Sequence, residues 1–172
     1  MVISVLVLFN VRGAAASEHL ASKCDALGAL AADPTRQSNP VDFGHIDAAA
    51  LISACRDAID VNIDITATGR YYLQLGRGQL KNGDANGAIA SFKRATAFEY
   101  PAGYFALGIT YLLGDDVEKD DEKAIYYLRL ALDKGVFWAA KALSNLHGDK
   151  ASKFYDTQLS KAYLERFNKL SF

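Results

Sequence analysis

Two cysteines have the clearest chemical potential in this 172-residue sequence. Cys24 and Cys55 each lie on a stripe of apolar residues spaced by three and four positions, as on one face of a helix. Two such helices packed as an antiparallel hairpin would face each other, and we expect a disulfide to join them. Closing a loop of about thirty residues in this way is worth roughly 3–4 kcal/mol. The alternative is a pair of unbonded cysteines packed as small apolar side chains.

The other residues with possible chemistry do not converge. His19, His45 and His147 are far apart, and none stands at ligand spacing from another histidine or from a cysteine, so we expect no metal site. Asp115-Asp116 and Asp120-Asp121-Glu122 form an acidic loop, which solvation and helix capping explain better than a bound cation. The sequence also lacks a phosphate-binding glycine loop and a nucleophile elbow. It therefore predicts no catalytic residue, no cofactor and a protein that is not an enzyme.

Composition narrows the class of partner. The chain has 19 Lys and Arg against 20 Asp and Glu, for a net charge of −1. Without a basic surplus or a polybasic run, we expect no binding to nucleic acid or to anionic lipid. Apolar residues make up 51% of the chain, and only three prolines interrupt it. Such a composition favours an ordered, helical protein.

The first sixteen residues resemble a signal peptide. Met1 to Val11 is a short apolar run, and Ala14-Ala15-Ala16 supplies the small residues of a cleavage site. The run is too short for a transmembrane helix, which needs roughly 20 apolar residues. We therefore expect cleavage after Ala16, no stable membrane insertion afterwards, and a periplasmic or secreted bacterial protein, which the even number of cysteines supports. The alternative is a buried segment of the core.

Residues 17–66 are expected to form a helical hairpin. The pattern predicts one helix from Ser17 to Ala32 and a loop over Thr35–Pro40, which has polar residues between two prolines. Asp47 is a plausible N-cap for a second helix that reaches Ile59.

Residues 67–172 contain three segments with one skeleton. Each segment has a small residue in its first helix, at Gly76, Gly108 and Ser144. In the first two segments a pair of alanines with constant spacing follows in the second helix: Ala88 with Ala95, and Ala124 with Ala131. Small residues allow paired helices to approach closely, and large residues fill the space between units. Because one unit cannot bury its apolar face alone, the fold class predicted is all-α, a short solenoid of stacked helix–turn–helix units.

The second segment carries a family resemblance. The run from Leu107 to Gly135, LGITYLLGDDVEKDDEKAIYYLRLALDKG, resembles a Sel-one-like repeat, a relative of the tetratricopeptide repeat. Asp116 stands where the family's pattern has a second loop glycine. The third segment resembles a terminal cap closed by a helix over Asp156–Asn168. The matching positions are Leu107, Gly108, Tyr111, Gly114, Val117, Asp120, Lys123, Ala124, Tyr127, Ala131 and Gly135.

A solenoid of this kind has a concave face lined by the first helix of each unit. A groove there with basic rims and an apolar floor would suit a peptide that carries acidic groups or a terminal carboxylate. The alternative is that the same residues are ordinary solvated or capping positions. The residues predicted to face the groove are Arg70, Leu73, Arg77, Lys81, Phe105, Ile109, Leu112, Trp138, Lys141 and Asn145.

Three functions follow from these patterns. The resemblance implies a non-enzymatic adaptor or regulator that binds another protein or peptide in the periplasm or cell envelope. One alternative is a β-lactam-binding or hydrolysing enzyme of the family's cysteine-rich branch, in which each unit has its own disulfide. Here both cysteines precede the recognisable repeats, so that match is poor. The other alternative is an oligomerisation or accessory domain.

Overall fold

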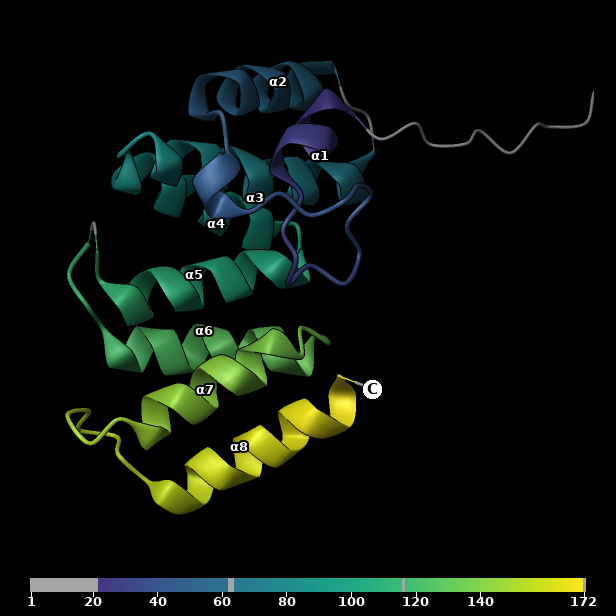
Figure 1. Cartoon of the computed structure of the whole chain (residues 1–172). Helices are drawn as coiled ribbons and strands as arrows, with labels where there is room; N and C mark the ends of the chain where they lie inside the picture. Colours follow the sequence, from purple (N-terminus) through teal and green to yellow (C-terminus); the bar gives the residue numbers. More distant parts are fainter. Residues whose placement is uncertain (1–21, 62–63, 116, 172) are drawn as a thin grey trace, which may run out of the picture.

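The computed structural model describes residues 22–61, 64–115 and 117–171 (Figure 1). These residues form eight α-helices and one short 3₁₀ helix, and no strand occurs among them. The predicted all-α class is therefore confirmed. The predicted signal peptide, residues 1–16, lies outside the described residues, as does His19. The helices are α1 Lys23–Gly28, η1 Phe43–His45, α2 Ala48–Val61, α3 Ile65–Lys81, α4 Ala85–Ala97, α5 Pro101–Leu113, α6 Asp121–Asp133, α7 Trp138–Gly148 and α8 Thr157–Leu170.

Consecutive helices pack against each other and form one stack from α2 to α8 (Figure 1). Three helix–turn–helix units follow one another, α3 with α4, α5 with α6, and α7 with α8. The predicted small residues lie at the centres of these pairs. Gly76 faces the ring of Phe92, and a Cβ on Gly108 would lie 2.7 Å from Leu128 Cγ. The absent side chains are thus what allows the two helices of a unit to touch.

The N-terminal hairpin repeats this arrangement in a shortened form. A Cβ on Gly28 in α1 would lie 2.6 Å from Leu51 Cδ1 in α2, so Gly28 takes the place that Gly76 and Gly108 take in later units. The same Leu51 side chain also packs near Gly78 of α3. The hairpin therefore continues the stack as a further unit with a short first helix.

The first predicted helix ends earlier than expected, and its predicted first residues, 17–21, lie outside the described residues. It ends at Gly28 instead of Ala32, because the chain turns into an extended conformation at Ala29. The carbonyl of Gly28 accepts a hydrogen bond from the Arg77 side chain, and the carbonyl of Ala29 accepts one from Arg77 and one from the Val41 N–H. These partners replace the helical N–H groups that would continue α1.

The remaining element predictions are confirmed. Asp47 accepts a hydrogen bond from the Ala50 N–H at the start of α2. Asp84 and Asp120 cap α4 and α6 through their side chains. The closing helix α8 packs on α7 through Tyr163 and Phe167, which are half-buried, and its far face is polar and exposed.

No helix in the described part of the chain has the length and hydropathy needed to cross a bilayer. The buried apolar side chains form three clusters that follow one another along the stack, from the hairpin to α7. Half-buried Tyr72 packs against the first two of these clusters, and Leu30 and Tyr127 pack against the last two. The core therefore continues from unit to unit, as a solenoid requires.

Candidate functional site

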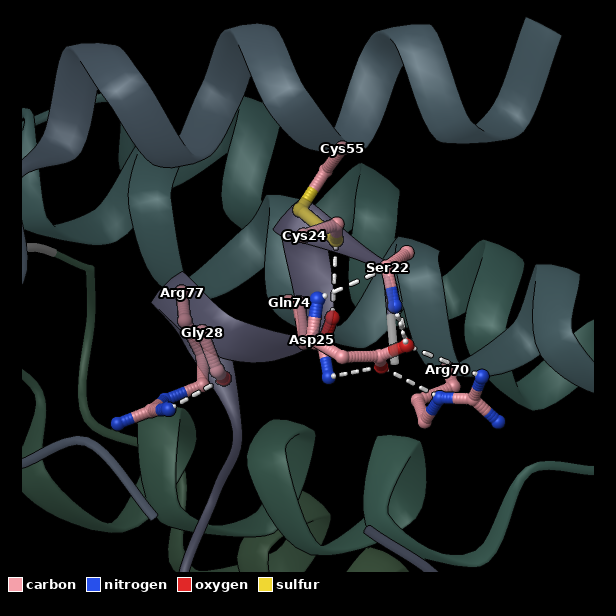
Figure 2. Close-up of a disulfide and its surroundings, with 8 residues drawn as sticks. All are labelled: Ser22, Cys24, Asp25, Gly28, Cys55, Arg70, Gln74 and Arg77. Carbon is pink, nitrogen blue, oxygen red and sulfur yellow. Dashed lines mark hydrogen bonds and ion pairs between the residues drawn. A yellow bond between two sulfur atoms is a disulfide. The ribbon is translucent and has the colours of Figure 1, made fainter. Parts of the chain in front are cut away.

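The cysteines form a disulfide between α1 and α2 (Figure 2). Cys24 and Cys55 are both completely buried. The predicted pair is thus confirmed, and the alternative of two free thiols is excluded for this structure. The bond fixes α1 against α2 and so holds the short unit closed.

A buried ion pair joins α1 to α3 beside the disulfide. Arg70 Nε donates to Asp25 Oδ1 over 2.6 Å, and Gln74 Nε2 donates to the same oxygen over 3.0 Å (Figure 2). Burial alone would raise the pKa of Asp25, but hydrogen bonds from Arg70, Gln74 and Ser22 together with the charge of Arg70 hold that pKa below its ordinary value. Asp25 therefore stays ionised in the interior.

Arg77 holds the backbone that leaves α1. Its guanidinium donates to the carbonyls of Gly28, Ala29 and Val41 over 2.5, 2.8 and 2.8 Å. Desolvation lowers the pKa of Arg77 to about 10, although the charge of Asp42 opposes that shift. The side chain is still a cation at neutral pH, and its charge lies at the C-terminal end of α1, where a helix dipole favours it.

The loop after α1 passes over α3 toward the start of α5 (Figure 1). Asp33 is completely buried in this loop and accepts hydrogen bonds from the Tyr100 hydroxyl and from the Thr35 N–H and hydroxyl. Because Tyr100 is the N-cap residue of α5, this contact ties the loop to the second repeat unit.

The chain from Ala29 to Ile46, here called the covering segment, shows that the predicted concave groove is wrong in part. Arg70, Leu73 and Arg77 were expected on an open concave face, but each is buried, with exposures of 5%, 0% and 6%. The two arginines bind α1 and its following loop, so they cannot form a basic rim for a partner. Lys81 is exposed, donates to the Gly44 carbonyl over 3.3 Å and lies 5.5 Å from the centre of the Phe43 ring.

An open groove remains where the covering segment ends. It has a volume of about 380 Å³ and lies between α3 and α5, with one wall from the loop around η1. Of the ten predicted residues, Phe105, Ile109 and the buried Arg77 line it. Leu112 packs into the core beside it and is half-buried. The lining residues are Leu30, Phe43, Arg77, Leu80, Phe92, Phe105, Ala106, Ile109, Thr110, Leu113 and Asp115.

The third unit does not contribute to this groove. The Trp138 ring centre lies 5.3 Å from that of Phe167 in α8, and Lys141 Nζ lies 6.0 Å from the Phe167 ring. Asn145 is exposed on α7. Trp138 and Lys141 are therefore neighbours of the closing helix, and none of the three lines the groove with Phe105 and Ile109.

Several groove residues were missed by the sequence reasoning. Leu30 was expected inside the first helix but lies in the loop that follows α1, and Phe43 lies in η1, for which no element was predicted. Leu80 and Leu113 lie near the ends of α3 and α5. The sequence did contain a signal that the N-terminal hairpin is a further unit of the stack, since Leu27-Gly28 repeats the Leu75-Gly76 pair of the first unit.

The acidic and histidine-containing segments form no metal site in the described part of the chain, where no three His, Cys, Asp or Glu side chains converge. Asp120 accepts from the Lys123 N–H and pairs with its ammonium group over 2.8 Å. His147 is buried, its Nδ1 lies 2.7 Å from the Phe154 carbonyl, and its ring stacks on Tyr163. Asp120 and the Nδ1 atom of His147 therefore have structural partners.

The fold and the groove define the class: an all-α solenoid of stacked helix–turn–helix units with an apolar groove on its surface. The chain matches no protein-family model, no curated protein and no solved structure.

Proposed function

We propose that this chain is a non-enzymatic protein-interaction module that works in the bacterial periplasm or cell envelope and binds another protein through the surface of its stacked repeats. The groove between α3 and α5 is the observation that carries this proposal. Phe43 and Leu113 at its edge are 44% and 59% exposed, and the half-buried Phe105 and Ile109 lie inside it. A concavity lined by aromatic and aliphatic side chains is typical of a binding site.

The state of the ionisable groups supports binding over catalysis. Asp25 and Arg70 pair with each other, Asp33 binds Tyr100 and Thr35, and Arg77 binds three carbonyls. Catalytic groups in active sites face a cleft where substrate reaches them. Asp25, Asp33 and Arg70 lie outside the lining of the groove, and the guanidinium of Arg77 is already occupied.

Export is proposed from two observations. The first sixteen residues have the pattern of a signal peptide. The buried disulfide supports the same compartment, because structural disulfides persist in oxidising environments such as the periplasm.

We also propose that Leu107–Gly135 is a Sel-one-like repeat. Local structure supports this. Gly114, a position of the family's loop motif, has a left-handed backbone with φ of 69°, and Asp120 caps the following helix. Ala124, another motif position, is completely buried.

Site-specific photo-crosslinking tests the function. A photoreactive phenylalanine analogue is placed at Phe105 in the groove or, as control, at Tyr126, which is 60% exposed on α6 outside the groove. In cells that produce the protein, the probe at position 105 is expected to give a discrete adduct with another protein that position 126 does not give. The same adducts at both positions, or none at position 105, would contradict binding through the groove.

A further inference from the structure

We propose that the groove holds a peptide segment of another protein that carries a bulky apolar side chain close to a lysine or arginine, and that this basic residue pairs with Asp115. This inference rests on the proposed function and specifies the chemistry of the partner.

The groove is large enough for one side chain of a partner but not for a whole helix. Its volume of about 380 Å³ is near the lower end for ligand sites in proteins, which run from roughly 300 to 1,000 Å³. Phe105 and Ile109 from α5 and Leu80 from α3 surround this space. A buried aromatic or aliphatic anchor from the partner gains the most there, as at other interface hot spots.

The charge at the groove favours a basic residue next to that anchor in the partner peptide. Arg77 and Asp115 are the charged residues of its lining. The guanidinium of Arg77 already donates to three backbone carbonyls, so it offers little to a carboxylate of the partner. Asp115 is exposed and forms no ion pair with another residue in the described ranges. Arg77 remains a cation but is buried, so the charge that a partner can reach at this site is the negative charge of Asp115.

This reverses the chemistry expected from the sequence. An acidic peptide was predicted because Arg70 and Arg77 were expected on the concave face. In the structure, Arg70 forms an ion pair with α1, and Arg77 donates hydrogen bonds to the backbone that follows α1. Lys81 lies outside the lining and contacts the Gly44 carbonyl and the Phe43 ring.

The groove is also held in shape before a partner arrives. Leu30 follows Ala29, whose carbonyl Arg77 binds, and Phe43 precedes Gly44, whose carbonyl Lys81 binds. The disulfide anchors the start of the same segment to α2. A wall fixed in this way reduces the ordering cost of binding.

Panning a phage-displayed library of random dodecapeptides against the full chain tests the proposal. We expect selected peptides to combine a large apolar residue with Lys or Arg. One selected peptide is then synthesised with a fluorescent label, once as selected and once with its basic residues changed to Glu. Binding of both is measured by fluorescence anisotropy.

Two variants with matched controls locate the contact. Asp115→Lys is expected to weaken the basic peptide by at least about threefold, as for loss of an exposed ion pair, and to strengthen the Glu-containing peptide. Glu165→Lys on the exposed side of α8 changes the net charge equally and is expected to change neither. Leu113→Glu is expected to weaken both peptides at least tenfold, whereas Tyr126→Glu at similar exposure is not.

The outcomes separate the two proposals. Selection of acidic or uncharged peptides, or equal binding of the basic peptide by wild type and Asp115→Lys, overturns the proposal of a basic partner. If Leu113→Glu still weakens binding in that case, the groove remains a binding site. Failure to select any peptide, or binding that Leu113→Glu does not weaken, overturns both. A concentration-dependent dimer that Leu113→Glu converts to monomer would place a second copy in the groove and also overturn the proposal.

Discussion

Removing the disulfide gives the sharpest test of how the N-terminal unit is held. We consider Cys24→Ala combined with Cys55→Ala, which removes the bond and leaves no buried thiol. The two residues are 31 positions apart. The chain-entropy relation then predicts a loss of about 3.7 kcal/mol in the free energy of unfolding. For a domain of this size that corresponds to a fall in Tm of about 10 °C.

The assay is thermal unfolding followed by circular dichroism, with and without reductant. Wild type with reductant is expected to unfold near the temperature of the double variant, and reductant is expected to leave the variant unchanged. A Tm within about 2 °C of wild type for the variant would refute the reasoning, because the covering segment would then be fixed without the bond.

Three further predictions follow from individual contacts. Arg70→Met should destabilise the fold by about 3–5 kcal/mol because it leaves Asp25 as an uncompensated buried charge. In urea unfolding, the double variant with Asp25→Asn should lose less free energy of unfolding than the sum of the two single variants, and additive losses would contradict the pairing. The folded-state pKa of Asp25 lies below its unfolded value, so the unfolded chain binds more protons in acid: the contribution of this group is present above pH of about 4 and is lost as pH falls through the folded pKa. Stability measured from pH 6 downward should therefore fall less steeply for Asp25→Asn than for wild type, and equal slopes would contradict this. Gly108→Ala should lower the free energy of unfolding by about 1–3 kcal/mol, because its Cβ would lie 2.7 Å from Leu128, while Gly44→Ala, with nothing within 4 Å, should have little effect in the same unfolding assay.

The alternative of a β-lactam-hydrolysing enzyme can be tested with a simple assay. We expect no hydrolysis of nitrocefin by the purified, oxidised protein above the rate of buffer, because the one disulfide joins α1 to α2 and does not recur in the units with α3 to α8 in the described residues. Turnover that survives further purification would contradict the proposed non-enzymatic role.

Much of the fold was predictable because local and pairwise signals agreed. The small residues Gly76 and Gly108 mark places where two helices touch, and their recurrence predicts the stack directly. Asp84 and Asp120 cap helices through contacts that span three residues. Such signals depend on neighbours in the chain or on a repeat period, and both are visible in a sequence.

The groove was predicted only in part, because its walls come from distant segments. The repeat pattern placed Phe105 and Ile109 on the concave side of α5, and both line the groove. The same pattern placed Arg70 and Arg77 in the open, where a standard solenoid would have them. It carries no information on a loop that folds back over α3.

The sequence by itself determined the helical units, their caps and the stripes that bring Cys24 and Cys55 together, since each depends on spacing along one helix or on a repeat. Only the tertiary structure decided which part of the concave face stays open. Asp25 binds Arg70 across 45 positions, and Gly28 binds Arg77 across 49. Burial of a cation requires partners that neutralise or solvate it, and those partners are chosen by the path of the chain in space.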